Sequence, residues 1–275
     1  MINKDYLLDS KQMANFVSDG FLRFDELVPN ELNKAAHKAM EDRTALGDPK
    51  GGSAGVPFSR VWTQDSPMRR IFDMPEIQGI IHSMVGSDPL YDHQSIHIVN
   101  VGNHSGQIWH GDAIIDTRMH FDIQFFYFPH DTPREMGGTM ILPGSHYRRI
   151  CETDIARYQN FLGQLPTVCN AGTILVVHHG MWHCAQPNLT DQTRYMFKLR
   201  LNPTVRQMQL WNTDDVGDPS IPGLLGKHHK WYGNDARLEL VNRIKFWRFL
   251  TGNERFDMGY WLSRLENMPE NVAVA

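Results

Sequence analysis

Five short apolar runs decide the fold of this chain: SIHIVNV (95–101), IQFFYF (123–128), TMILPG (139–144), TILVVHH (173–179) and MFKLRLN (196–202). Each has the length and the β-branched or aromatic content of a strand, and turn-rich pieces separate them. Helical segments are missing between most of them, which argues against the parallel sheet of an α/β fold. We therefore predict a mainly β fold with a double-stranded β-helix, or jelly roll, as its core at about residues 94–202.

The segments on either side of this core, residues 1–90 and 204–270, carry helical patterns. Helices are expected after Ser10 and after Pro29, with the strand FLRFDELV (21–28) between them, and two short helices should meet near Pro75. In the second flank, ARLELVNRIKFWRFL (236–250) predicts a helix with an apolar side made by Leu238, Val241, Ile244, Phe246 and Leu250. Without a repeat or a linker, residues 1–275 are expected to form one domain.

The composition excludes several classes of partner. The 275 residues carry a net charge of -4 with a pI near 6.4, and no clustered Lys and Arg indicate a nucleic-acid surface. No apolar stretch reaches the roughly 18 residues that would span a membrane. Three cysteines without CxxC spacing predict neither a disulfide framework nor a thiolate zinc site. We expect a cytoplasmic protein whose partners are small molecules.

WHGD (109–112) is the first motif that carries chemistry. In an extended strand, His110 and Asp112 are two residues apart and project to the same face. Non-haem Fe(II) oxygenases need two imidazoles and one carboxylate on one side of the ion. The second imidazole should come from a later strand, and TILVVHHGMWHCAQPN (173–188) supplies three candidates, which are His178, His179 and His183. Spacing alone does not choose among them.

Arg194 favours His183 as the third ligand. An oxygenase that uses 2-oxoglutarate must neutralise the distal carboxylate of this co-substrate, and a guanidinium does so with two parallel charge-assisted hydrogen bonds. Arg194 lies eleven residues after His183 in RYMFKLRLN (194–202), which reads as the next strand. That arrangement predicts that its side chain approaches the metal from a neighbouring strand.

Three blocks, WHGD, GGTMILPGSH (137–146) and HCAQPNLTDQTR (183–194), together resemble the phytanoyl-CoA dioxygenase family of iron and 2-oxoglutarate oxygenases. The family pattern is WHxD, a Gly-rich strand ending in PGSH, and HxSxxNxSxxxR, and the resemblance covers about residues 94–202. It implies Fe(II) ligation by His110, Asp112 and His183, with 2-oxoglutarate bound by Arg194 and Thr139. Ascorbate is a candidate reductant. Ala185 departs from the pattern, because a Ser hydroxyl often assists the co-substrate at this position.

A rival HxD, formed by His120 and Asp122, follows ten positions later. Asp112 lies 31 residues before Pro143 of PGSH, close to the interval in the family, whereas Asp122 lies 21 residues before it. The rival pair also lacks the preceding Trp. We therefore assign the first pair as ligands, and we expect PGSH itself to form a turn in which His146 makes a local hydrogen bond.

The resemblance implies hydroxylation of an unactivated C–H bond by dioxygen, with release of succinate and CO2. Asp112 disfavours halogenation, because halogenating relatives replace this carboxylate with a small residue. Two alternatives use the same residues: a jelly-roll protein that binds a metal or a small molecule without catalysis, and a zinc-dependent hydrolase. No basic cluster of the kind that binds a CoA phosphate is evident, so the expected substrate is a small metabolite.

Overall fold

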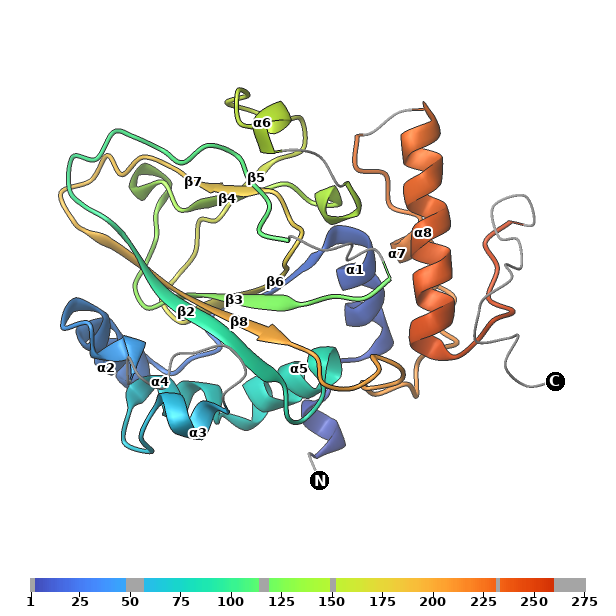
Figure 1. The fold of residues 1–275 in the computed structure, drawn as a ribbon, viewed down its shortest axis with the longest axis horizontal. Coiled ribbons are helices and arrows are strands. Elements are labelled where there is room, and N and C mark those ends of the chain that lie inside the picture. The colour runs from blue at the N-terminus through green and yellow to red at the C-terminus, as the bar shows by residue number, and fades with distance from the viewer. Residues whose placement is uncertain (1–2, 48–56, 114–118, 149–151, 231–232, 260–275) are drawn as a thin grey trace.

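A computed structural model describes residues 3–47, 57–113, 119–148, 152–230 and 233–259 (Figure 1). Two antiparallel sheets form the jelly-roll core, one of five strands in the order β1-β6-β3-β8-β2 and one of three in the order β5-β4-β7. The strands are β1 (Phe21–Phe24), β2 (Leu90–Val99), β3 (Ile123–Phe128), β4 (Thr139–Ile141), β5 (Leu165–Pro166), β6 (Thr173–His178), β7 (His183–Ala185) and β8 (Arg194–Asn202). The predicted fold class is confirmed. The strand expected at 21–28 is the edge strand β1, which pairs with β6 far along the chain.

Side-chain alternation divides the large sheet into two faces. On β3, Phe125 and Tyr127 pack into the main core, whereas Phe126 and Phe128 belong to a second cluster between the sheets. This follows from the period of two along a strand. Because β3 pairs with both β6 and β8, the same alternation continues across three neighbouring strands. The face that carries Phe126 is the one that looks toward the small sheet.

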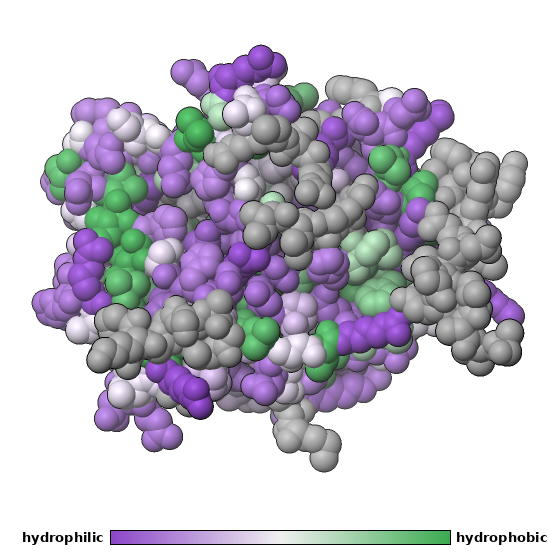
Figure 2. Space-filling model, viewed as in Figure 1, coloured by the Kyte–Doolittle hydropathy of each residue, from purple (hydrophilic) through white to green (hydrophobic). Residues whose placement is uncertain are grey.

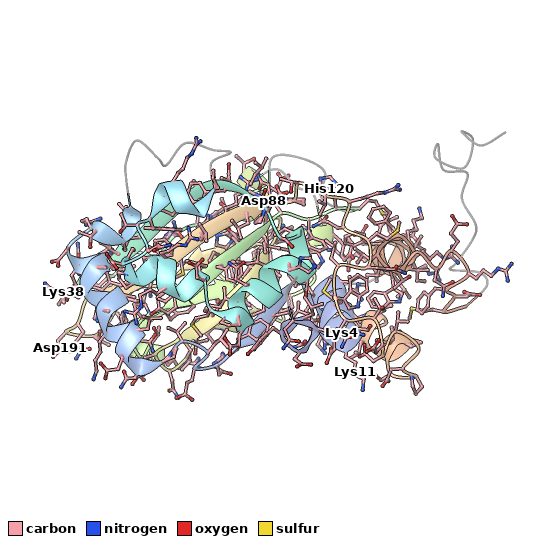
Figure 3. All side chains as sticks on the ribbon, turned by 90° about the horizontal axis from the view of Figure 1, so that it is seen from below. Lys4, Lys11, Lys38, Asp88, His120 and Asp191 are labelled. Atoms are coloured by element: carbon pink, nitrogen blue, oxygen red, sulfur yellow. The ribbon has the colours of Figure 1, made fainter. Side chains whose placement is uncertain are left out.

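Helices cover the other face of the large sheet. They are α1 (Ser10–Asp19), α2 (Asn30–Glu41), α3 (Phe58–Val61), α4 (Pro67–Phe72) and α5 (Pro75–Val85), with 3-10 turns η1 (Lys4–Tyr6) and η2 (Thr44–Leu46). Asp9 and Gln12 form a capping box at the start of α1, and Gly20 ends it in a left-handed conformation. Figure 3 shows the N-terminal helices lying across the strands when the molecule is seen from below. The two short helices predicted to meet near Pro75 are α4 and α5.

The remaining helices are α6 (Glu152–Ile155), α7 (Ile221–Leu225) and α8 (Gly233–Thr251), with 3-10 turns η3 (Arg134–Met136) and η4 (Ser145–Tyr147). The predicted apolar side of α8 is wrong at Leu238, which is 53% exposed. Its neighbour Glu239 is buried instead, because its carboxylate lies 2.6 Å from Arg148 and 3.7 Å from Arg243. The ion pairs of Glu239 with Arg148 and Arg243 therefore hold the first half of α8. Residues 260–270, for which the sequence also predicts a helix, lie outside the described residues.

Polar side chains cover most of the face shown in Figure 2, and the apolar residues on it form separate small groups. No helix in the described ranges is long and apolar enough to cross a membrane. The predicted site residues His183, Arg194 and Thr139 lie in the interior of the jelly roll, around a pocket between the two sheets.

Candidate metal centre and adjoining pocket

Backbone pairing brings the two predicted histidine ligands together. The His110 N–H donates to the His183 carbonyl at 3.1 Å, and the His183 N–H donates to the His110 carbonyl at 2.9 Å. His183 also pairs with Ile141 of β4, so WHGD extends the small sheet beyond β7. Adjacent antiparallel residues that share a face bring their side chains close together. The two imidazole centroids are 4.4 Å apart as a result.

Asp112 completes a compact set of ligand atoms. Its two carboxylate oxygens lie 4.0 Å from His110 Nε2 and 3.5 Å from His183 Nε2. One ligand atom from each of the three residues lies within 4.8 Å of the others, and within the described ranges no other group of His, Cys, Asp or Glu meets this condition. Two imidazoles and one carboxylate on one side of a common point fit the facial triad of non-haem Fe(II) proteins.

Backbone carbonyls set the tautomer of both histidines. Nδ1 of His110 donates to the carbonyl of Ile108, and Nδ1 of His183 donates to the carbonyl of Met181, both at 2.9 Å. Each bond directs the lone pair of Nε2 toward Asp112, as is usual for metal-bound histidines. Burial lowers the pKa of His183 to about 4, so its ring is neutral near pH 7. The donor set is therefore ready to bind a metal.

A buried lysine from the opposite sheet contacts this triad. Lys198 on β8 donates to Asp112 Oδ2 over 2.6 Å, and its side chain is only 8% exposed. Burial alone would raise the pKa of Asp112, but the neighbouring His183 and Lys198 hold it well below its ordinary value. Asp112 therefore stays ionised, which is the form that could bind a metal.

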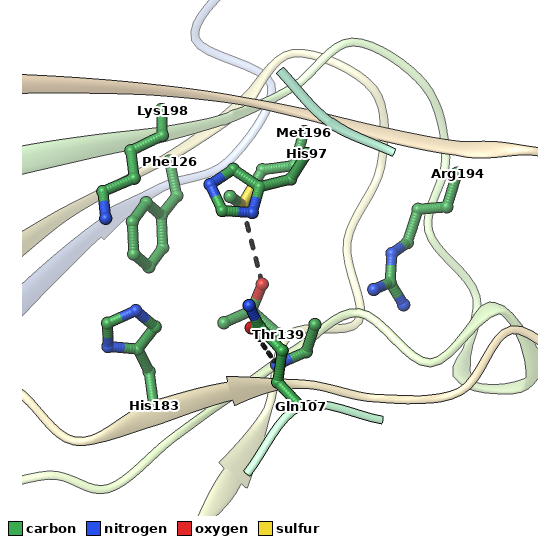
Figure 4. Close-up of a pocket in the computed structure, with 9 residues that line it drawn as sticks. His97, Gln107, Phe126, Thr139, His183, Arg194, Met196 and Lys198 are labelled. Atoms are coloured by element: carbon green, nitrogen blue, oxygen red, sulfur yellow. Dashed lines mark hydrogen bonds between the residues drawn. The ribbon is translucent and has the colours of Figure 1, made fainter. Parts of the chain in front are cut away.

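A small pocket opens beside the triad between the two sheets (Figure 4). Arg194 and Lys198 come from one strand and lie toward opposite ends of the pocket in Figure 4, with His183 at the lysine end. Thr139 and Gln107 line the wall between them. The full lining is His97, Gln107, Phe126, Thr139, His183, Ala185, Arg194, Met196 and Lys198.

Arg194 is held in place by main-chain oxygens. Its Nη1 donates to the carbonyls of Met136 at 2.7 Å and Gln186 at 3.1 Å, and the residue is 4% exposed. A Cβ on Gly137, whose φ is +90°, would lie 2.8 Å from this nitrogen and 2.1 Å from the Pro187 carbonyl. The first glycine of GGT therefore leaves room for the guanidinium. Burial lowers the pKa of Arg194 to about 10, which still leaves it fully charged at neutral pH.

The rival residues lie elsewhere. His120 is exposed at the surface (Figure 3), and Asp122 is bound to Arg200 at 2.9 Å. His178 accepts a hydrogen bond from the Gly180 N–H at its Nδ1. His146 of PGSH is buried, and the prediction that it makes a local hydrogen bond is wrong: its Nε2 lies 3.2 Å from the carbonyl of Val17 in α1. None of these four joins the group that could hold a metal.

Sequence reasoning missed three polar residues of the pocket: His97, Gln107 and Lys198. The signal for Lys198 was available, because Arg194, Met196 and Lys198 alternate on one face of a predicted strand. Gln107 accepts a hydrogen bond from the Ala185 N–H at 3.1 Å. Its amide group therefore lies next to Ala185, where the family pattern has a serine. Nothing in the sequence connects Gln107 with Ala185, because only folding brings the two segments together.

Comparison with known families adds to this geometry. Residues 16–196 match the family described as "Phytanoyl-CoA dioxygenase (PhyH)". The chain belongs to this family. The match includes the candidate ligand motif WHGD, the GGT strand, PGSH and Arg194. The resemblance inferred from the three motif blocks is thus confirmed for this PhyH-family chain. No curated protein sequence matches it significantly.

Solved structures share the fold of this PhyH-family protein. The non-heme alpha ketoglutarate dependent carbocyclase SnoK from nogalamycin biosynthesis matches with a TM-score of 0.54 at 15% identity, over 74% of this chain and 87% of SnoK. EctD from S. alaskensis, with 2-oxoglutarate and 5-hydroxyectoine, matches at 0.54 and 17% identity, over 71% and 76% of the two chains. The epimerase SnoN, in complex with Fe3+, alpha ketoglutarate and nogalamycin RO, gives the same TM-score and identity, over 70% and 82%.

Proposed function

We propose that this PhyH-family protein is an oxygenase that uses Fe(II) and 2-oxoglutarate and hydroxylates an unactivated C–H bond of a small metabolite. The observation that carries the proposal is the pocket that extends from His183, one member of the His110–Asp112–His183 group, to the buried Arg194. A binding site with a metal triad at one end and a guanidinium at the other suits a short dicarboxylate that chelates metal at one end. Bound Fe(II) and 2-oxoglutarate would supply the chemistry that activates dioxygen.

The residues of this chain then have separate roles. His110, Asp112 and His183 would hold the metal, and the carbonyl bonds to their Nδ1 atoms keep both rings in the ligating tautomer. Arg194 would bind the distal carboxylate of 2-oxoglutarate, and Thr139 would line the methylene chain between the two ends. Gln107, whose amide oxygen is used by the Ala185 N–H, would direct its NH2 donors in place of the missing serine.

The balance of the reaction is R–H + O2 + 2-oxoglutarate → R–OH + succinate + CO2. One oxygen atom enters succinate and the other enters the product. Dioxygen accepts four electrons, two from the oxidative decarboxylation of 2-oxoglutarate and two from the substrate C–H bond. Ascorbate would serve only to restore an oxidised metal between cycles. Fold relatives named as a carbocyclase and an epimerase show that this architecture serves more than one outcome, so hydroxylation is the part that most needs a test.

The test begins without oxygen. Purified protein is titrated with Fe(II) and 2-oxoglutarate under nitrogen, and a visible charge-transfer absorption band reports chelation. In air, succinate formation from 2-oxoglutarate is followed over a panel of small metabolites, and products are identified by mass spectrometry. We expect His110→Ala to abolish the band, and His120→Ala, from the rival motif, to retain it.

Two other results would contradict the proposed oxygenase function, and each would support a different function. Tight zinc binding without a 2-oxoglutarate band, together with hydrolytic activity, would support the zinc hydrolase. A normal band with no succinate from any substrate in the panel, coupled or uncoupled, would support a binding protein that keeps the metal pocket without catalysis.

A further inference from the structure

The face of the large sheet that lines the pocket continues beyond the metal group. In register, Phe126 pairs with Lys198 beside Asp112, and the next inward pair is Gln124 with Arg200. One step further, the His179 N–H donates to the Asp122 carbonyl at 3.0 Å, and Asn202 follows Arg200 by two residues on β8. We refer to Gln124, His179, Arg200 and Asn202 as the inner-face cluster.

The inner-face cluster contains an unusual number of buried polar atoms without partners. Both amide atoms of Gln124, both ring nitrogens of His179, Nε of Arg200 and Oδ1 of Asn202 have no hydrogen-bond partner. They make up six of the fourteen such side-chain atoms in the part of the chain that the structure describes. Gln124 is 0% and His179 is 1% exposed. Buried polar groups are nearly always hydrogen-bonded, so this concentration points to a ligand that supplies the missing partners.

The inner-face cluster lies close to the metal group. A Cβ on Gly111, between His110 and Asp112, would lie 3.4 Å from the Gly180 carbonyl, so the segment that carries His179 runs beside the ligand motif. Two residues along a strand span about 7 Å, which is the step from Lys198 to Arg200. A small molecule whose polar group binds at Gln124 can therefore place its carbon skeleton next to the metal.

Charge pairing at the inner-face cluster indicates the class of that polar group. The guanidinium of Arg200 is shared between Asp92 and Asp122, at 2.9 Å each, and Lys198 is bound to Asp112. Burial, together with the charge of Arg200, lowers the pKa of His179 to about 2, so its ring is neutral with one donor and one acceptor. Gln124 also offers both kinds of group. An anionic or cationic ligand would find its charge partners already occupied.

We propose that the inner-face cluster is the substrate subsite, and that it binds an uncharged group with both hydrogen-bond donors and acceptors, such as a carboxamide or a hydroxylated ring. This inference rests on the proposed oxygenase function for its place in catalysis, but the binding itself is independent of turnover. A site built to hydrogen-bond such groups discriminates strongly against analogues that lack them, because its own polar atoms are then left unpaired. Acyl-CoA thioesters, with their phosphates, do not fit it.

The test measures binding of small probes to the full-length protein loaded with Zn(II) and 2-oxoglutarate, and with Zn(II) alone. Saturation-transfer NMR is recorded for acetamide, acetate and methylammonium, which have similar sizes and different charges. We expect acetamide to bind and the two ions to show no signal above that of a denatured sample. Gln124→Leu and His179→Phe should each weaken acetamide binding about tenfold, whereas His120→Phe, a surface change of the same type, should leave it unchanged.

Thermal unfolding separates a binding role from a structural one. Gln207 is also buried but makes three hydrogen bonds, so Gln207→Leu should lower the Tm by several degrees. Gln124→Leu, which removes two unpartnered atoms, should not lower it. Equal acetamide binding by the wild type and both cluster variants, or preferred binding of acetate, would overturn the subsite. The anaerobic Fe(II) and 2-oxoglutarate band reports the proposed function separately: its absence with acetamide bound removes the oxygenase and leaves the subsite standing.

Discussion

Replacing Lys198 with methionine tests whether the buried lysine and a metal share Asp112. In the metal-free protein the change leaves the Asp112 carboxylate without its 2.6 Å ammonium partner. Breaking a buried ion pair costs 3–5 kcal/mol, and because the Asp112 side chain is 20% exposed we take the lower end, about 3 kcal/mol. For a chain of this size that corresponds to a Tm lower by about 6–12 °C.

A bound divalent ion changes this result. It supplies positive charge to the same carboxylate, so the loss of Lys198 should cost only about 1 kcal/mol in the metal-loaded protein. By linkage, the difference of about 2 kcal/mol must appear as metal binding that is roughly 30-fold tighter in Lys198→Met. The Lys198–Asp112 ion pair would thus stabilise the metal-free protein, and it would weaken metal binding because Lys198 and the metal compete for the same carboxylate.

The assay combines urea unfolding of the metal-free and Mn(II)-loaded proteins with Mn(II) titration followed by electron paramagnetic resonance. Lys4→Met is the matched control, because Lys4 and Asp214 are also 2.6 Å apart but are 56% and 71% exposed. That pair should contribute under about 1 kcal/mol and should not affect Mn(II) binding. Unchanged or weaker Mn(II) binding by Lys198→Met would refute the reasoning.

Three further changes probe the co-substrate pocket, the buried histidines and the last helix. Arg194→Lys keeps the charge but loses the planar fork, so the Kd for 2-oxoglutarate should rise about 10- to 100-fold in the anaerobic titration; a change below threefold would contradict the role given to Arg194. His97 and His229 have their pKa lowered to about 4 by burial, so the unfolded chain binds protons that the folded chain excludes as the pH falls from about 6.5 to 4. The free energy of unfolding should therefore decrease toward acid pH by up to about 1.4 kcal/mol per pH unit for each histidine, and equal urea midpoints at pH 7 and 5 would argue against this. Glu239→Ala removes the buried carboxylate that lies 2.6 Å from Arg148 and 3.7 Å from Arg243 and should cost about 3 kcal/mol, whereas Leu238→Ala beside it should cost under about 0.5 kcal/mol; calorimetry that reversed this order would show that these ion pairs do not hold α8.

Local pattern in the sequence determined the elements and much of the candidate site. The strands β3, β6 and β8 follow from short apolar runs rich in β-branched and aromatic residues, and the helices α1 and α2 follow from helical patterns after Ser10 and Pro29. His110 and Asp112 could be paired because residues two apart on an extended segment project to the same face. Arg194 could be connected to His183 because it lies eleven residues later, on the next strand along the chain. These are consequences of short-range geometry, which sequence spacing expresses directly. The sequence did not show that this strand, β8, belongs to the opposite sheet and is not a neighbour of β7.

Only the tertiary structure decided which residues from distant segments meet. The sequence does not state which strand each histidine pairs with. In the structure His183 pairs with His110, whereas His179 is hydrogen-bonded to Asp122, next to β3 of the opposite sheet and near Arg200. Lys198 reaches Asp112 across the two sheets, and Gln107 reaches Ala185 through loops far apart in the chain. The buried side of α8 was mispredicted for the same reason, since Arg148 makes burial of Glu239 favourable. Contacts of this kind depend on how the two sheets stack and on partner charges, and neither is encoded in the periodicity of one segment.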